Sequence, residues 1–320
     1  MHRFRRWLAW GIAFGALLYL GFSVWADATG VWDRLLAFQW WIYGPVLLLT
    51  VGNYSLRFWK WQYLAGKLGV KLPWRENLLV FAAGLAMVIS PAKAGEVLKP
   101  YLVRERTGVP MARTIPALVT ERLTDGIACV LLAAFSVTTY AGDQAWILVV
   151  LGAVSFGGIG VLMHEGLSLA ILDLLVKLPG IGKVGSKLRE LYTAMRVCVA
   201  PVPMALTILA SLVAWGLECV GYLLVFRGFG FDVSLDLSTF LYAFATVAGG
   251  FMPGGLGMAD GALVGGAMQF VPGMDKNTAV AAALLIRVAT LWFGVFVGAF
   301  AMVRVAALLD PPKEGGGAAA

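Results

Sequence analysis

The chain has 320 residues, of which 60% are hydrophobic and only 13% are charged. Soluble domains carry about 25% charged residues, and at a mean hydropathy of +0.82 there is too little polar surface to enclose a soluble core. The composition excludes a soluble protein and indicates a polytopic membrane protein. In such a chain the net charge of +7 reports topology first, so no nucleic-acid partner is expected. Three scattered cysteines imply neither a disulfide framework nor a zinc site.

The first apolar run, residues 7–26, follows a basic stretch and leads into Ala26-Asp27-Ala28, which resembles a signal-peptidase site. The apolar core of a signal peptide is usually about 7–15 residues long. This run has 20 residues and is rich in Trp and Tyr, which favours a retained anchor helix over a cleaved signal peptide.

Five further runs predict full membrane spans, because each approaches the roughly 20 residues that cross a bilayer core. The first of them closes with Arg57, Trp59, Lys60 and Trp61, a pattern typical of a membrane interface. The five runs lie at residues 40–56, 115–140, 145–163, 202–226 and 279–303.

Two shorter apolar runs are each interrupted by proline and glycine. Residues 78–89 break at Ser90-Pro91 and continue to Lys99; residues 237–252 break at Pro253 and resume at 261–271. A run of about 12 residues is short for a span and suits a re-entrant hairpin better. The break positions are Pro91, Gly95, Pro253, Gly254, Gly255 and Gly257.

Between residues 165 and 199 the chain is amphipathic, with Leu188, Leu191, Met195 and Val199 at helical spacing. This pattern predicts an interfacial helix on the cytoplasmic surface. The final Gly- and Ala-rich residues, 315–320, predict a low-complexity tail.

Charge counting orients these elements. With six full spans and two re-entrant hairpins, 20 Lys and Arg residues fall inside and three outside. This strong positive-inside signal predicts cytoplasmic N- and C-termini.

The predicted halves also run in opposite directions through the bilayer. Each contains a span, a Pro-x-x-x-Gly break and a second span with an arginine, Arg122 or Arg287. Interrupted segments at matching positions point to a transport site between inverted repeats. Breaks of this kind are also common in membrane helices without such a role.

The sequence thus predicts an all-α polytopic membrane protein with about six full transmembrane helices and two re-entrant helical hairpins in an inverted repeat. The predicted divisions are an N-terminal anchor helix and outer loop at 1–39, a first repeat at 40–141 with its break at 90–95, and a span with the amphipathic helix at 142–201. The second, inverted repeat covers 202–305 with its break at 252–257, and a disordered tail covers 306–320.

Six charged residues are predicted at membrane depth, where an isolated charge costs a few kcal/mol. One interpretation is an ion-pair lock that holds the bundle together. The other makes Arg122 and Arg287 phosphate-binding cations that the carboxylates orient, because guanidinium binds phosphate in a bidentate manner. Both remain open. The six are Glu121, Arg122, Asp125, Glu218, Asp260 and Arg287.

The first break is a second candidate site. Its unpaired backbone N–H groups, with Lys93 and Lys99, would attract an anionic head group; alternatively, both lysines only extend to the cytoplasmic interface. The glycines of the second break allow either close backbone approach to a ligand or tight helix packing. Glu218 is a proton-coupling candidate, although a pair with Arg287 is favoured.

Signatures of catalysis are weak. His2 is terminal and His164 lies at an interface, so no His-based metal site or triad is predicted. The sequence has no Asp-rich magnesium motif and no P-loop. We therefore expect no enzyme activity, no cofactor and no metal.

Four motifs resemble the lysylphosphatidylglycerol synthase transmembrane-region family, the flippase part of bacterial multiple peptide resistance factors and their stand-alone relatives. They are Pro91-Ala92-Lys93-Ala94-Gly95-Glu96 with Lys99, Glu121-Arg122-x-x-Asp125, Pro253-Gly254-Gly255-Leu256-Gly257 with a nearby acid, and Arg287 with Trp292.

The resemblance, over roughly residues 40–305, implies a helical fold with two re-entrant hairpins and a head-group cavity that serves lipid transfer between leaflets. It implies that the cavity residues are Lys93, Glu96, Arg122, Asp125, Asp260 and Arg287. Asp260 stands where the family more often has Glu. The chain also lacks a soluble aminoacyl-transfer domain, which leaves the substrate open.

The expected function is a flippase for an anionic phospholipid or a polyprenyl-phosphate-linked lipid, working by alternating access in the bacterial cytoplasmic (inner) membrane. Lys93, Glu96, Lys99, Arg122 and Arg287 would bind the head group, and Glu121, Asp125, Glu218 and Asp260 would pair with them or couple transport. The alternatives are a proton-coupled small-solute transporter and a non-transporting subunit of a lipid-biosynthesis complex. Beyond a membrane lipid, the partners left open are a second copy of the chain and lipid-biosynthesis enzymes.

Overall fold

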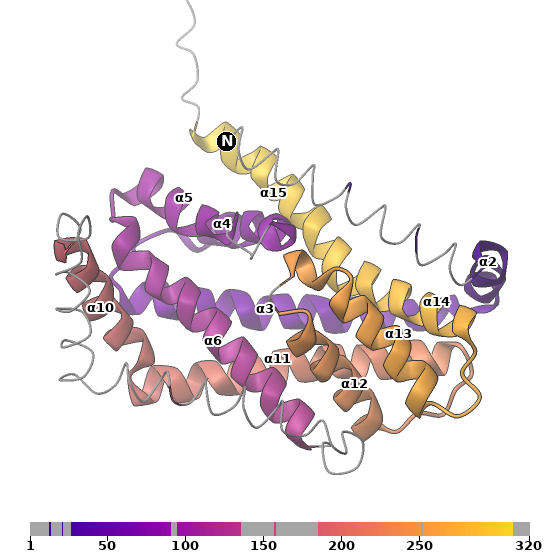
Figure 1. Cartoon of the computed structure of the whole chain (residues 1–320). Helices are drawn as coiled ribbons and strands as arrows, with labels where there is room; N and C mark the ends of the chain where they lie inside the picture. Colours follow the sequence, from indigo (N-terminus) through magenta and orange to yellow (C-terminus); the bar gives the residue numbers. More distant parts are fainter. Residues whose placement is uncertain are drawn as a thin grey trace, which may run out of the picture.

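The computed structural model describes residues 27–90, 95–135, 185–250 and 252–309, and every element in these ranges is helical (Figure 1). The predicted spans at 7–26 and 145–163, Pro91 and Lys93 of the first break, and the tail 315–320 lie outside the described residues. The helical class agrees with the sequence prediction.

We call residues 27–90 and 95–135 the first described stretch, and residues 185–250 and 252–309 the second. The first contains α2 (Ala28–Ala37), η1 (Trp40–Ile42), α3 (Tyr43–Lys67), α4 (Trp74–Ala86), η2 (Met87–Ile89), α5 (Leu98–Thr107) and α6 (Met111–Phe135). The second contains α10 (Gly185–Val199), α11 (Pro201–Gly228), α12 (Leu235–Ala248), η6 (Pro253–Gly255), α13 (Met258–Phe270), α14 (Lys276–Arg287), η7 (Val288–Trp292) and α15 (Phe293–Leu309). In each stretch a long helix is followed by two shorter helices around a break and then by a second long helix. The re-entrant hairpins and the division into repeats stay predictions.

Local sequence explains where these helices start and stop. Ser234 and Asp275 cap α12 and α14, because their side chains accept hydrogen bonds from N–H groups of the first turn. Gly108 follows α5 with φ of +73°, a left-handed conformation that terminates a helix at little cost in glycine. Pro201 begins α11, where its missing N–H is not needed.

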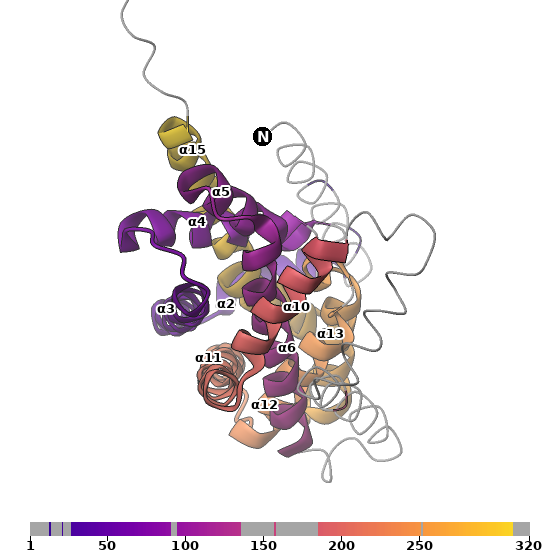
Figure 2. The same ribbon diagram turned by 90° about the vertical axis from the view of Figure 1, so that its left-hand side faces the viewer.

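Among the described helices, α3 and α11 have the most extensive contact, and they pack antiparallel. Gln39 donates to the Gly228 carbonyl at one end, and Lys60 contacts Ser211 further along. The two helices lie side by side in both views, nearly end-on in Figure 2. Antiparallel leading helices are what an inverted repeat requires, although the repeat itself remains a prediction.

The broken hairpins pack reciprocally against the long helices. Helix α4 of the first hairpin packs against α15, and α12 of the second hairpin packs against α6. The two breaks also touch, since η2 contacts η6 and Ile89 clusters with Leu256 and Leu291. Each hairpin is thus held by the last long helix of the other stretch.

Within the described ranges, two helices are long and apolar enough to cross a membrane, Pro201–Gly228 and Lys276–Val305. A third is added if Ala28–Ala37 and Trp40–Lys67, which are bent by 76° at their junction, count as one span. The predicted total of six spans and the re-entrant path of the hairpins remain predictions. Helix α10 confirms the amphipathic segment over its described part, with Met195 and Val199 buried and Arg196 exposed.

Candidate functional site

A cavity of about 90 Å³ lies between the two described stretches, next to both breaks. Its walls come from α3, α4, α6, α11 and α12, from η2 and η6, and from the α13–α15 region. The lining residues are Asn53, Tyr54, Arg57, Leu85, Val88, Arg122, Trp215, Glu218, Tyr242, Thr246, Gly249, Gly254, Gly255, Ala259, Arg287, Thr290, Leu291 and Gly294.

Three arginines line this cavity. Arg122 comes from α6 and Arg287 from the end of α14, and both were candidates from the sequence. The third is Arg57 of α3, which the sequence reading placed at the membrane interface. Arg287 is followed directly by the π-helical turn η7, a local irregularity that often marks functional sites in helices. The lining is therefore rich in the group that binds phosphate best.

Two of these arginines form ion pairs with acidic side chains that do not line the cavity. The Nε of Arg122 lies 3.2 Å from Glu96, and its Nη1 lies 3.5 Å from Asp125. The Nε of Arg287 donates to Asp260 over 2.9 Å. Both Glu96 and Asp260 come shortly after a break, so each stretch pairs the arginine of its last long helix with an acid of its own hairpin.

The second break needs glycine at three positions. Gly254, Gly255 and Gly257 have φ of +59°, +72° and +86°, a region that residues with side chains rarely adopt. This path aims the Gly254 carbonyl at the Nη2 of Arg287 and the Gly257 N–H at Asp260. The break thus contacts Arg287 and Asp260 of the protein itself, and its close approach to a ligand stays a prediction.

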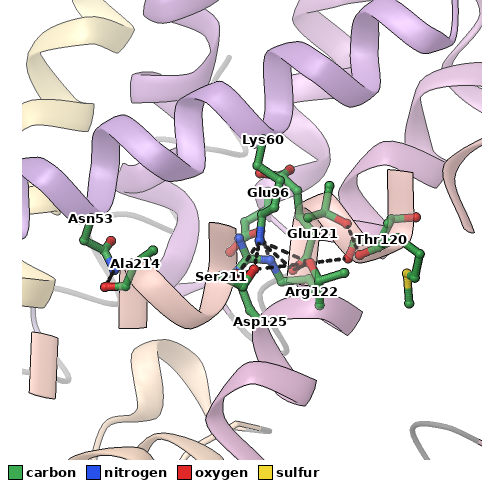
Figure 3. Close-up of polar contacts among 12 residues, drawn as sticks. Asn53, Lys60, Glu96, Thr120, Glu121, Arg122, Asp125, Ser211 and Ala214 are labelled. Atoms are coloured by element: carbon green, nitrogen blue, oxygen red, sulfur yellow. Dashed lines mark hydrogen bonds and ion pairs between the residues drawn. The ribbon is translucent and has the colours of Figure 1, made fainter. Parts of the chain in front are cut away.

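Arg122 also belongs to a buried ion-pair cluster, which Figure 3 shows. Lys60 of α3 donates to Asp125 over 2.5 Å and to Ser211 over 2.6 Å, while Ser211 donates to Asp125 over 3.0 Å. Lys99 of α5 donates to Glu121 over 2.5 Å. The cluster thus links α3, α5, α6 and α11 through side chains that are almost fully buried.

The family model described as "Lysylphosphatidylglycerol synthase TM region" matches residues 8–298 of the chain. The chain belongs to this family. It is also similar to a UPF0104 membrane protein of Methanothermobacter thermautotrophicus, with 26% identity over 313 residues that cover 90% of each chain. The resemblance proposed from the motifs is confirmed, and the protein is a membrane protein of this family.

The structure corrects the sequence reading of the second span in this family member. That span was expected to end at residue 56, with Arg57, Lys60 and Trp61 at the interface. Helix α3 instead continues to Lys67, and these three side chains are 8%, 0% and 0% exposed. Trp61 donates to Asn77, and the carboxylates of α6 compensate the charge of Lys60. Trp59, at 45%, remains exposed as expected.

Lys60 and Arg57 are site residues that the sequence reading missed. A signal was available, because Asn53, Arg57 and Lys60 recur at spacings of four and three and so share one helix face. Three of the 20 bases assigned to the cytoplasmic side, Arg57, Lys60 and Lys99, are buried, which leaves 17 against three for the positive-inside count.

Lys99 was a candidate either for binding an anionic head group or for extending to the cytoplasmic interface, and its position in the structure matches neither. It does not line the cavity or extend to the interface; its Nζ lies 4.4 Å from the centre of the Trp61 ring and pairs with Glu121. The Gly95 N–H, expected to be available for an anion, donates to the Ser90 hydroxyl over 2.7 Å. This N–H is therefore already paired within the protein.

The expected pair between Glu218 and Arg287 is wrong, because Asp260 takes the place beside Arg287. Glu218 lines the cavity from α11, near the positive charge of Arg57 and the hydroxyl of Tyr242. One of its oxygens, Oε2, has no hydrogen-bond partner among the described residues.

Ten charged side chains of the described residues are buried or line the cavity, four more than the six predicted at membrane depth. Five are cations and five are carboxylates, so the region is neutral when all are ionised. An additional anion at the arginines must therefore compete with acids that are already in place. The ten are Arg57, Lys60, Glu96, Lys99, Glu121, Arg122, Asp125, Glu218, Asp260 and Arg287.

Proposed function

We propose that this protein moves an anionic phospholipid or a polyprenyl-phosphate-linked lipid between membrane leaflets, with the lipid phosphate held in the cavity. The observation that carries the proposal is the convergence of Arg57, Arg122 and Arg287 on one cavity between the two broken hairpins. The family to which the chain belongs is named after lysylphosphatidylglycerol synthase, and this name supports a lipid as the substrate. The proposal includes no covalent chemistry.

The ion pairs suit reversible binding. The side chain of Arg122 is 27% exposed, while the Glu96 side chain that pairs with it is 3% exposed. A phosphate can therefore approach Arg122 from the cavity while Glu96 stays behind it. Because hydrogen bonds to charged groups contribute about 1.5–3 kcal/mol each, a phosphate gains enough to bind, and the resident acids limit how tightly it stays.

The packing of the hairpins suits alternating access. The two breaks touch beside the cavity, and each hairpin packs on the last long helix of the other stretch. A shift of one hairpin against its long helix would open the cavity toward one side, and the matching shift of the other would open it toward the opposite side.

The proposal places the protein in the bacterial cytoplasmic membrane, with both termini on the cytoplasmic side, as the excess of basic residues in the predicted inner segments favours. Its principal partner is the membrane lipid itself. Association with a second copy or with lipid-biosynthesis enzymes belongs to the same proposal.

Purified protein in liposomes tests this function. Fluorescent phosphatidylglycerol should become accessible to an outside quencher faster than in protein-free liposomes. Arg57→Gln should slow this movement by about ten- to 100-fold, the equivalent of one charge-assisted hydrogen bond. The matched control is Arg75→Gln, at an exposed position outside the cavity, which should move lipid at the wild-type rate.

Two results would contradict the proposal. Wild-type liposomes that move no more lipid than empty ones would exclude a flippase. Uptake of a soluble solute driven by a proton gradient and lost in Glu218→Gln would favour the small-solute transporter instead.

A further inference from the structure

The side of the cavity formed by α3 and α11 carries four polar atoms that have no hydrogen-bond partner among the described residues. Two are acceptors, Oδ1 of Asn53 and Oε2 of Glu218. Two are donors, Nε of Arg57 and Nε1 of Trp215. All four residues line the cavity, so the unsatisfied atoms are gathered at one site.

Neighbouring contacts hold these groups in position. The amide nitrogen of Asn53 donates to the Ala214 carbonyl over 2.8 Å, which ties α3 to α11 at this level. The Arg57 guanidinium lies over the Trp215 ring, 5.8 Å from its centre. Residues 53 and 57 are one turn apart on α3, and 215 and 218 are nearly one turn apart on α11, so the four side chains form a compact patch.

Phosphate binding does not account for this patch. A phosphate only accepts hydrogen bonds, so it leaves Asn53 Oδ1 unsatisfied. An ammonium group only donates, so it leaves Arg57 Nε and Trp215 Nε1 unsatisfied. A hydroxyl both donates and accepts, and two hydroxyls on adjacent carbons match two donors and two acceptors.

We infer that the α3–α11 patch is a second subsite that binds the hydroxyl-bearing part of a lipid head group, a glycerol or a sugar, beside the phosphate. This inference rests on the proposed lipid transport and specifies its substrate class. Arg122 and Arg287 hold the phosphate together with the Nη groups of Arg57, while the Nε of Arg57 joins Asn53, Trp215 and Glu218 in holding hydroxyls.

The consequence is selectivity among anionic lipids. A site built to hydrogen-bond a hydroxyl discriminates strongly against an analogue that lacks it, because its own polar groups then stay unpaired. Phosphatidylglycerol and phosphatidic acid both carry a phosphate, but only phosphatidylglycerol adds free hydroxyls. Recognition of the phosphate alone would not prefer phosphatidylglycerol.

The test compares transport of matched lipids by the full-length protein in liposomes. The probes are fluorescent phosphatidylglycerol, phosphatidic acid and phosphatidylethanolamine, and polyprenyl phosphate with and without one hexose. Wild-type protein should move the hydroxyl-bearing member of at least one anionic pair at least about tenfold faster than its partner. The pair that shows the preference tells whether the hydroxyls belong to glycerol or to a sugar.

Two variants link the preference to the patch. Trp215→Phe keeps an aromatic ring and removes the N–H, and Glu218→Gln keeps the shape and replaces one carboxyl oxygen with an amide NH2 group. Each should reduce the preference about five- to tenfold, the equivalent of one hydrogen bond. Trp59→Phe, at an exposed tryptophan outside the cavity, is the control and should keep the wild-type preference.

The outcomes are distinct. If no lipid moves, the proposed function fails and the subsite with it. If each anionic pair moves at equal rates, or if phosphatidylethanolamine is preferred, lipid transport stands and the hydroxyl subsite is overturned. If Glu218→Gln does not fold, Trp215→Phe decides, and an unchanged preference in that variant overturns the inference.

Discussion

Replacing Asp125 with asparagine removes one charge from the buried cluster while keeping its shape. Lys60, with 0% of its surface exposed, would then lack its carboxylate partner. Breaking a buried ion pair in this way costs about 3–5 kcal/mol, because the remaining charge stays out of water without compensation. Lys60 keeps hydrogen bonds to Thr124, Ser211 and the Glu121 carbonyl, so we expect the lower end, about 3 kcal/mol.

Thermal unfolding in detergent measures this cost. A loss of about 3 kcal/mol corresponds to a melting temperature lower by about 6–12 °C, by the scaling of chains with 150–250 residues. The exposed Asp232→Asn variant should melt as the wild type does. The double variant Lys60→Met with Asp125→Leu should recover part of the loss, because no unpaired lysine remains.

Two results would refute this reasoning. If the double variant is no more stable than Asp125→Asn, an uncompensated Lys60 charge is not the cause of the loss. If Asp125→Asn keeps its melting temperature and stops lipid transport, the pair belongs to the transport machinery and is not a lock.

Two further predictions concern packing and capping. A Cβ at Gly298 would lie 2.3 Å from the Ala86 backbone nitrogen, so Gly298→Leu should separate α15 from α4 and prevent recovery of folded protein. Gly216 has open space around it, so the control Gly216→Ala should fold normally. A Gly298→Leu variant that elutes as folded protein on size-exclusion chromatography would contradict this prediction. In the loop before α14, burial alone would raise the pKa of Asp275, but hydrogen bonds from Thr278 and the charge of Arg34 lower the pKa overall. Asp275→Ala should therefore lower the free energy of unfolding by about 1 kcal/mol at neutral pH. The difference between wild type and variant should shrink as the pH falls below about 3.9, the ordinary Asp pKa, and through the lower pKa of the folded state. A difference that stays constant down to pH 2 would show that the carboxylate charge is not involved.

The helix breaks and two of the cavity arginines could be predicted from the sequence, because each depends on the pattern of neighbouring residues. Proline and glycine at Pro253 and Gly257 interrupt an apolar run, and the structure breaks there. Arg122 and Arg287 stand out because an arginine in an apolar run is costly, and both line the cavity.

What could not be predicted depends on contacts between distant segments. A hydropathy reading ends a span at Arg57 and Lys60 because charges are costly in lipid, yet α3 continues because α6 supplies Asp125 as a partner for Lys60. The sequence also predicts a pair between Glu218 and Arg287, because both are charges in apolar runs. The choice of Asp260 instead depends on the turn that the three glycines of the second break create.

The central claim is that the arginine-lined cavity holds a phosphate-bearing lipid. Native mass spectrometry of the purified protein tests it most directly. We predict a co-purifying lipid that contains phosphorus in the wild type and in Arg75→Gln, and its loss in Arg57→Gln. Equal retention of that lipid in Arg57→Gln, or a bound lipid without a phosphate group, would contradict the claim.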